Sequence, residues 1–407
     1  MSKIRDGLYG FIIGDAFGAY CEFVPRDKLL EKPVTDMLGY GTFDVPEGTW
    51  TDDTCMTLAT IDSIINKKKI DTFDIMTNFY FWVKEGRFTA TGYAFDIGRT
   101  TLKAISTFSK TMDLSLCGQS LITDNGNGSL MRMLPIVYYC HYKKVKAEEI
   151  YTIVRDVSSL THSNEISIMG CYIYVRFLLN ILSGKDKNDS YRSLRRYNYG
   201  KYFKPETVDL YKRIIKEDIT DYKVSDISST GYIVDTLEAV FYVVMNSTKF
   251  SDAIIGAANL GNDTDTIAAI AGSIAGVIYG YDSFPVKWIF KLQRQDYLNN
   301  ICETFEECLE KENPSYPYNY FSVIFGDHPK EYRKQLEEAG LELKDRYITR
   351  EEFYKTFTDI LELTNSEIIV KPIEEYMAAI DLLNDKNSLE KQSEKDFIKM
   401  FEKIGKK

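Results

Sequence analysis

The sequence is poor in the residues that hold zinc and other borderline metal ions. Its 407 residues include three histidines and seven cysteines, and no two cysteines form a CxxC pair. Zinc sites use mainly these two residue types, so a zinc centre is not expected. The cysteines are odd in number, scattered and mostly set in apolar stretches, which is typical of reduced core residues in a cytosolic protein. We therefore expect a cytoplasmic location.

Long apolar runs and basic faces are missing as well. The apolar run 266–280 is shorter than the roughly 20 residues of a membrane span and is rich in glycine and alanine, so we predict a buried helix and no membrane partner. Lys3 and Arg5 precede another apolar run, but Asp6 and Asp15 limit it, which argues against a signal peptide. With a formal net charge of -10 and a pI of about 5.1, the chain lacks the basic face of a general nucleic-acid binder.

The residues that are present favour a large helical core. Hydrophobic residues make up 44% and aromatic residues 14% of the chain, whereas strand signals are weak throughout. Helical periodicity or length marks segments 8–20, 54–66, 70–83, 100–109, 147–159, 164–182, 235–245, 250–259, 266–280 and 286–312, the last as two pieces. Gly10, Gly14 and Gly18 are spaced four apart, which gives their helix a face that another backbone can approach closely. Gly272 and Gly276 mark a similar face. We predict a compact all-α globule whose loops carry the chemistry.

The composition changes after residue 312. The stretch NPSYPYNY holds two prolines and three tyrosines, and the chain beyond it is more charged. Helical segments are expected there at 350–361 and 372–383, followed by a Lys/Glu-rich helix at 391–407 with alternating charges. We predict one domain at 1–312, large enough to carry a catalytic site. A small helical C-terminal appendage is expected at 313–407, and the sequence does not indicate its role.

Two short segments each place three oxygen-bearing side chains at the start of a predicted helix. They are Thr51, Asp52 and Asp53 in GTWTDDTCMTLAT, and Asp263, Asp265 and Thr266 in NLGNDTDTIAAIAGSIAGVIYG. Thr and Asp are also ordinary helix N-caps, so capping alone is one interpretation. A cap needs only one acceptor, however, and neighbouring carboxylates repel one another unless a cation is present. Oxygen ligands without sulfur or imidazole suit Mg²⁺, Mn²⁺ or Ca²⁺, and the two clusters together predict a binuclear metal site.

Other loops carry groups suited to an anionic, sugar-bearing ligand. FTATGYAFDIGRTT and ITDNGNGSLMRMLP contribute glycines, hydroxyls and helix starts, namely Gly92, Asp96, Gly98, Arg99, Thr100, Thr101, Gly126, Asn127, Gly128 and Ser129. Glycines allow backbone N–H groups to approach a ligand, and a helix start favours an anion. LTHSNE adds His162 and SSTGYIVDTLEA adds Tyr232. Asn-Gly turns commonly only reverse the chain, and a lone histidine near a helix start is commonly a cap or core residue, so these alternatives stay open.

Seven segments, in one order along the chain, resemble the ADP-ribosylglycohydrolase family, of the dinitrogenase reductase-activating glycohydrolase type. They are GFIIGDAFGAYCEF, GTWTDDTCMTLA, FDIGRTT, NGNGSLMRMLP, LTHSNE, TGYIVDTLEA and NLGNDTDTIAAIAGSIAG. The resemblance covers residues 1 to about 312 and implies a compact all-α fold with two Mg²⁺ or Mn²⁺ ions at the base of a cleft. One departure is Asn262, where many relatives have the second glycine of GGDTDT. Asparagine tolerates a left-handed backbone, so the turn can persist.

The resemblance also implies roles for the acidic residues. The ions would be ligated from the two helix starts by Thr51, Asp52, Asp53, Asp263, Asp265 and Thr266. Glu22 would reach the same centre as a ligand or gate, whereas without the resemblance a partly exposed loop carboxylate is the favoured interpretation. Asp96 would act in proton transfer or ribose opening, and capping the helix near Gly98 is its alternative role.

The activity implied by the resemblance is a metal-dependent hydrolase that cleaves the glycosidic bond between ADP-ribose and a protein side chain, with arginine the leading acceptor. The amides of Gly92 and of residues 126–129 would cradle the diphosphate, while His162, Tyr232 or Phe95 would flank the ribose or adenine. One alternative is a hydrolase of a small-molecule or nucleic-acid ADP-ribose derivative. Another is a non-catalytic ADP-ribose-binding or immunity-type protein, against which the complete acidic set counts. The oligomeric state is not indicated.

Overall fold

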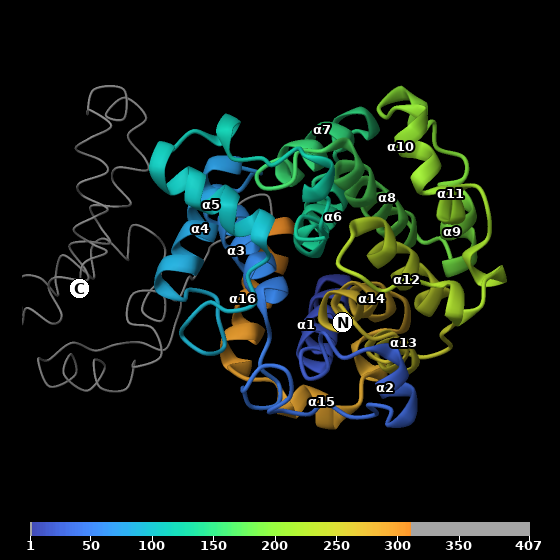
Figure 1. Ribbon diagram of the computed structural model, residues 1–407. Helices are drawn as coiled ribbons and strands as arrows, with labels where there is room; N and C mark the ends of the chain where they lie inside the picture. Colours follow the sequence, from blue (N-terminus) through green and yellow to red (C-terminus); the bar gives the residue numbers. More distant parts are fainter. Residues whose placement is uncertain (1, 311–407) are drawn as a thin grey trace, which may run out of the picture. The chain divides into compact units, whose positions relative to one another are not determined.

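A computed structural model describes residues 2–310 of the chain (Figure 1). This part contains α-helices, short 3-10 turns and two isolated bridges, Gln119 with His162 and Gly126 with Tyr232, but no named strand. The all-α prediction is therefore confirmed. The predicted appendage at 313–407, with its expected helices, lies outside the described residues.

The described helices follow most of the predicted segments. In chain order they are α1 (Lys3–Gly18), α2 (Arg26–Glu31), α3 (Asp52–Lys67), α4 (Thr72–Glu85), α5 (Arg99–Thr111), α6 (Leu134–Tyr142), α7 (Ala147–Ser158), α8 (Glu165–Leu182), α9 (Lys187–Leu194), α10 (Pro205–Leu210), α11 (Lys212–Ile215), α12 (Ile233–Asn246), α13 (Phe250–Ala258), α14 (Thr264–Tyr279), α15 (Val286–Lys291) and α16 (Gln295–Glu310). Helices α2, α6, α9, α10 and α11 were not predicted. They are short, and a short segment offers too few turns for a helical period to be distinguished.

The core is built on the close pair of α1 and α14. A Cβ on Gly10 would lie 2.2 Å from the carbonyl oxygen of Gly272, and a Cβ on Gly14 would lie 2.0 Å from that of Ala268. Both distances are far below van der Waals contact, so the two backbones meet only because these positions lack side chains. The two small-residue faces seen in the sequence are thus each other's packing partners.

The other helices enclose this pair on two sides (Figure 1). Helices α12 and α13 pack against α14, and α8 packs against α12, α7 and α6. On the other side, α3 packs against α4 and α16, and α5 covers α4. The N-terminal end of α3, from one side, meets the N-terminal end of α14, from the central pair, and the loops that precede them lie near this junction.

A further prediction about the core, that the cysteines are buried and reduced, is confirmed. All seven cysteines lie within the described residues, and each is buried and free of a disulfide bond. Among the described helices, α8 alone is long and apolar enough to span a membrane by composition, yet 72% of it is buried within the fold. It is a central core helix, as its apolar sequence indicates.

A backbone pairing brings the chain after α1 to the start of α14. The Phe23 N–H donates to the Asn262 carbonyl (2.6 Å), and the Asn262 N–H donates to the Val24 carbonyl (2.9 Å). Both Phe23 (φ 61°) and Asn262 (φ 62°) adopt the left-handed conformation that this tight exchange requires. The turn predicted to survive the replacement of glycine by Asn262 is present, and it places Glu22 beside the first turn of α14.

Candidate active site and metal centre

The first turns of α3 and α14 are joined by side-chain hydrogen bonds. The Thr51 hydroxyl donates to Asp265 Oδ2 (3.3 Å), and the Thr266 hydroxyl donates to Asp53 Oδ1 (3.3 Å). Thr51 also caps α3 by accepting from the Asp53 N–H (3.4 Å). Capping and convergence are therefore not alternatives at this site, because the same threonine does both. The structure brings together the two clusters that lie over 200 residues apart in the sequence.

Asp15 on α1 supports this junction, and sequence reasoning missed it. Its carboxylate accepts the Thr51 N–H at Oδ1 (3.0 Å) and, at Oδ2, the Thr54 N–H (3.0 Å) and the Thr54 hydroxyl (2.5 Å). Asp15 thus caps α3 from a different helix and fixes the direction in which the first turn of α3 presents Asp53. The available signal was a single acid inside the Gly/Ala-rich, helix-forming run GFIIGDAFGAY, a place where a charge needs a partner.

Carboxylate oxygens form two overlapping groups of a size that suits metal binding. Oxygens of Asp15, Asp53 and Asp265 lie within 4.8 Å of one another, and so do oxygens of Glu22, Asp263 and Asp265. Asp265 belongs to both groups. Asp53 Oδ2, Asp265 Oδ1 and Glu22 Oε2 are buried and have no hydrogen-bond partner. Buried oxygens of this kind are costly unless a cation binds them, so the residues present fit hard divalent ions.

The raised pKa values of the clustered carboxylates also fit a site for cations. Burial, and next the neighbouring carboxylates, raise the pKa of Asp52, Asp53 and Asp265 well above the ordinary value. Burial also raises the pKa of Asp15 and of Asp263 to about 6. None of these five carboxylates forms an ion pair with a lysine or arginine in the described part of the chain. Among the described residues the cluster therefore has no basic partner, and its negative charge can be offset by protons or by a bound cation.

Glu22 and Asp96 lie together above this cluster. Burial, and then the charges of Asp96 and Asp263, raise the pKa of Glu22, and burial raises that of Asp96, whose carboxyl contacts those of Glu22 and Asp265. Asp96 adopts a left-handed backbone (φ 56°), which is unusual for a residue other than glycine. It does not cap α5, whose N-cap is Gly98 without a side-chain acceptor. The capping alternative for Asp96 is therefore wrong, and its carboxyl faces the acidic cluster instead.

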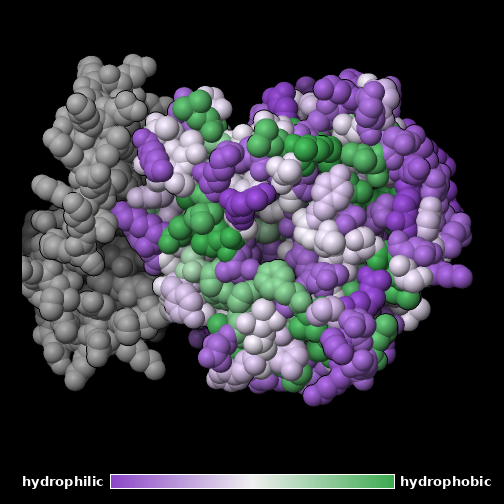
Figure 2. All heavy atoms as spheres, viewed as in Figure 1, coloured by the Kyte–Doolittle hydropathy of each residue, from purple (hydrophilic) through white to green (hydrophobic). Residues whose placement is uncertain are grey.

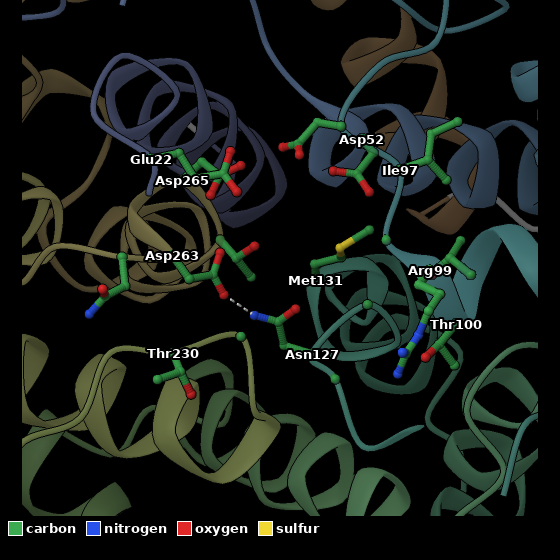
Figure 3. Close-up of a pocket in the computed structure, with 18 of the residues that line it drawn as sticks. Glu22, Asp52, Ile97, Arg99, Thr100, Asn127, Met131, Thr230, Asp263 and Asp265 are labelled. Carbon is green, nitrogen blue, oxygen red and sulfur yellow. Dashed lines mark hydrogen bonds between the residues drawn. The ribbon is translucent and has the colours of Figure 1, made fainter. Parts of the chain in front are cut away.

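A cavity of about 560 Å³ opens beside the acidic cluster. Figure 3 shows Glu22, Asp52, Asp263 and Asp265 along its upper and left sides, and Arg99 at its right. The Asn127 amide projects between them and donates a hydrogen bond to Asp263 (Figure 3). The face that Figure 2 shows is largely hydrophilic and carries separate hydrophobic patches. One wall of the cavity is thus acidic and another offers cationic and amide donors.

Several predicted ligand contacts line this cavity. They are Asp96, Gly98, Arg99, Thr100, Thr101, Gly126, Asn127, Gly128 and His162. No side chain caps α5, so its first N–H groups remain available at the cavity wall. Phe23, Met131, Thr230 and Gly231 also line it, and sequence reasoning did not single them out. Their segments were recognised, but which of their side chains turn inward depends on how the loops pack.

Four other predicted ligand contacts do not line the cavity. The Gly92 N–H donates to the Thr89 hydroxyl (2.8 Å) and so is not free for a phosphate. The Phe95 ring packs on Phe43, with ring centroids 5.2 Å apart.

The other two residues that do not line the cavity are Ser129 and Tyr232. Ser129 is fully buried, and its hydroxyl pairs with Cys171 Sγ (3.3 Å) and Ser158 Oγ (3.0 Å). Tyr232 precedes α12 and bridges to Gly126 through its backbone. The N–H of Gly92, the ring of Phe95 and the hydroxyl of Ser129 are thus engaged elsewhere, and for Tyr232 the backbone N–H donates to the Thr230 hydroxyl (3.2 Å).

Comparisons with known proteins identify the family and the fold. The sequence model of the ADP-ribosylglycohydrolase family matches residues 1–315. The chain is 35% identical over 306 residues to ADP-ribosylarginine hydrolase Tri1 of Serratia proteamaculans, covering 74% of this chain and 78% of that protein. It is 27% identical over 285 residues to ADP-ribosyl-[dinitrogen reductase] glycohydrolase of Rhodospirillum rubrum, covering 70% and 87%. A solved structure titled ADP-ribosylglycohydrolase-related protein complex has the same fold, with a TM-score of 0.63, 23% identity, and coverage of 76% and 98%.

Proposed function

The chain belongs to the ADP-ribosylglycohydrolase family, and we propose that it hydrolyses the glycosidic bond between ADP-ribose and an arginine side chain of a protein. The observation that carries this proposal is the convergence of two acidic helix starts on one cavity whose other wall offers donors. The arginine acceptor is taken from the similarity to the ADP-ribosylarginine hydrolase of Serratia proteamaculans. The cavity supplies space for a nucleotide-sized ligand.

We propose further that two Mg²⁺ or Mn²⁺ ions bind at the acidic cluster. The residues that would hold them are Glu22, Thr51, Asp52, Asp53, Asp263, Asp265 and Thr266. When bound, such ions supply a Lewis acid that orients ribose hydroxyls and stabilises negative charge near the scissile bond. Asp15 would act through α3, because its hydrogen bonds set the position of Thr51 and of the turn that follows.

Other residues of the chain would bind the diphosphate and transfer protons. The free N–H groups at the start of α5, with Arg99, face the cavity and suit the negative charge of a diphosphate. Asp96 is placed to exchange a proton at the reacting end, because its carboxyl lies against Glu22 and Asp265 and its pKa is raised by burial. It would accept a proton from the attacking water as the bond between the anomeric carbon and the arginine nitrogen breaks. The side chain would leave as a neutral guanidine and take up from Asp96 the proton that the attacking water gave, so it ends as guanidinium and Asp96 returns to its starting form.

The test is release of free ADP-ribose from an arginine-ADP-ribosylated protein, measured with Mg²⁺, with Mn²⁺ and with a chelator. Wild type is compared with Asp263→Ala and with the control Asp62→Asn. Asp62 is a buried carboxylate on α3 that accepts from Asn66 and Asn78 and does not line the cavity. We expect metal-dependent release by wild type and by Asp62→Asn, and none by Asp263→Ala. Absence of release under every metal, with release from a substrate linked through another residue, would show that the acceptor is not arginine.

A further inference from the structure

Arg132 is a fully buried cation without a carboxylate partner. It is 0% exposed, and in residues 2–310 no aspartate or glutamate forms an ion pair with it. Its Nη2 donates to the carbonyls of Val157 (3.2 Å) and Ser158 (3.4 Å) and to the Thr161 hydroxyl (2.7 Å), and the guanidinium lies 4.8 Å from the centre of the Phe79 ring. Burying a charge among neutral groups is costly, so a specific role for this arginine is expected.

The Thr161 hydroxyl connects Arg132 to His162. It accepts a hydrogen bond from Arg132, and its oxygen lies 2.7 Å from His162 Nδ1. Thr161 is also fully buried, and the described chain offers its single O–H no acceptor other than Nδ1. If Nδ1 carried the proton, the hydroxyl would receive two donors and its own hydrogen would be left unsatisfied. The arrangement that satisfies both the Thr161 hydroxyl and His162 Nδ1 has Thr161 donating to Nδ1. The imidazole proton is then on Nε2.

His162 is held in this form next to the cavity. Burial, and then the charge of Arg132, lower the pKa of His162 to about 3, so the ring stays neutral at physiological pH. The ring lines the cavity beside the two loop glycines. A Cβ on Gly128 would lie 3.0 Å from Cε1, and a Cβ on Gly126 would lie 3.6 Å from Nε2. The glycines thus leave Nε2 uncovered, and it has no partner within the described residues.

We propose that Arg132 and Thr161 are positioning residues that hold His162 as a neutral Nε2–H donor toward an oxygen acceptor of the bound ligand. The acceptor is a ribose or phosphate oxygen, because the substrate of the proposed function presents both. This assignment of the acceptor rests on that proposed function. A histidine free to exchange tautomers would offer a donor only part of the time, and a protonated one would bind the anion without selecting its position. The hydrogen bonds from Arg132 through Thr161 to His162 remove both the tautomer exchange and the protonation of the ring.

A purely structural role for Arg132 predicts something different. Its carbonyl partners are at the C-terminal end of α7, where a cation stabilises a helix whatever the histidine does. In that case the state of the His162 ring would not depend on Thr161. The tautomer of His162 therefore separates the two roles, and it can be observed without metal or substrate.

The first test is ¹⁵N NMR of histidine-labelled full-length protein treated with chelator. We expect His162 Nδ1 to give an unprotonated, pyridine-type signal and Nε2 a protonated one, unchanged between pH 5 and 8. Thr161→Val, which keeps the shape but removes the hydroxyl, should convert these signals to those of exchanging tautomers, and Thr161→Ser should restore them. A wild-type ring that is protonated on Nδ1 or cationic at pH 7 would overturn the proposal, as would a Thr161→Val ring identical to wild type.

The second test is the affinity for ADP-ribose, measured by calorimetry on the same variants. Loss of one oriented hydrogen bond should weaken binding by Thr161→Val about tenfold, while Thr161→Ser stays near wild type. Thr77→Val is the matched control, because Thr77 is buried on α4 and its hydroxyl only bonds the Phe73 carbonyl of its own helix (2.8 Å). Equal affinity of Thr161→Val and wild type would refute the ligand contact. If wild type keeps the expected tautomer but binds no ADP-ribose, the proposed function and the ligand assigned to Nε2 fail, while the role of Thr161 stands.

Discussion

Two buried charged regions lie near the cavity, and they differ in the sign of their charge and in the partners that the fold gives them. The acidic cluster has oxygens on Glu22, Asp53 and Asp265 that lack any hydrogen-bond partner. Arg132, which lies behind His162, is surrounded by carbonyls, a hydroxyl and an aromatic ring. The first region keeps unpartnered carboxylate oxygens at the cavity. In the second, the fold supplies neutral acceptors to Arg132 Nη2, whereas Nε and Nη1 have none within the described residues. This difference supports the two proposals, that the acidic region binds ions and that Arg132 helps to orient His162.

The backbone contributes to both regions. Asp52, Asp53 and Asp265 lie in first turns, where helix N–H groups and the positive end of the helix dipole favour negative charge. Arg132 meets the last carbonyls of α7, where the dipole favours a cation. Each buried charge is therefore placed at the helix end that tolerates it, but dipoles alone do not neutralise five or more carboxylates.

The largest expected effect comes from removing one charge of the acidic cluster. Asp265→Asn should lower ADP-ribose release about a thousandfold or more, because Asp265 belongs to both oxygen groups. In the chelated protein the same change should raise the melting temperature, since the remaining carboxylates repel one another less. Activity assays and differential scanning calorimetry test the two halves. A variant that is both inactive and less stable without metal would contradict the account of this region as strained by like charge.

The next effect concerns the contact that holds the acidic cluster together. Gly14→Ala should destabilise the protein by about 3 kcal/mol, because a Cβ there would lie 2.0 Å from a carbonyl oxygen of α14. Gly256→Ala is the control. Its Cβ would meet Val243 Cγ1 at an ordinary 3.6 Å, so the alanine should be neutral or stabilising. Urea unfolding of both variants decides this, and equal stability would mean that α1 and α14 are less tightly packed than the structure has them.

A pH effect distinguishes the two regions by its sign. His162 has a folded-state pKa of about 3, below the unfolded value, so its contribution to stability is present above about pH 6.5 and is lost as the pH falls. Between pH 7 and 5 this loss should reach about 2 kcal/mol. Asp15 and Asp263, with pKa values raised to about 6, act oppositely: without metal, their contribution is lost as the pH rises through 6.

The test is urea unfolding of wild type and of His162→Gln, both treated with chelator, at pH 7 and pH 5. The difference between the two proteins gives the contribution of His162 to the free energy of unfolding, because the carboxylates are common to both. Wild type should lose more stability than the variant on acidification. An identical pH dependence in the two proteins would show that His162 is not held neutral.

The smallest effect is expected at Asn262, which joins loops on two sides of the cavity. Its side chain donates to Ser229 Oγ (3.0 Å), while its φ of 62° is one that glycine adopts more easily. In Asn262→Gly the lost hydrogen bond and the relieved backbone should offset each other to within about 1 kcal/mol. KM for the ADP-ribosylated protein should change less than about threefold. A tenfold change in KM with unaltered stability would instead make Asn262 a specificity residue.

Sequence reasoning succeeded where the signal is local. Helical period located the long helices, including α8 and α14, and the two Asp-Thr clusters were recognisable by their oxygen content. It failed where the direction of a group depends on distant segments. Gly92, Phe95, Ser129 and Tyr232 belong to the right loops, yet none of them lines the cavity.

The sequence by itself determined the all-α class, the membership of a family and the residue types of an oxygen-ligand centre, because periodicity, motif order and side-chain chemistry are properties of short segments. Only the tertiary structure decided that α1 and α14 share a glycine-lined contact, that Asp15 caps α3 from another helix, and that Arg132 reaches His162 through Thr161. Each of these depends on atoms brought within hydrogen-bonding or van der Waals distance by packing. Such distances are set by the whole fold and have no counterpart in spacing along the chain.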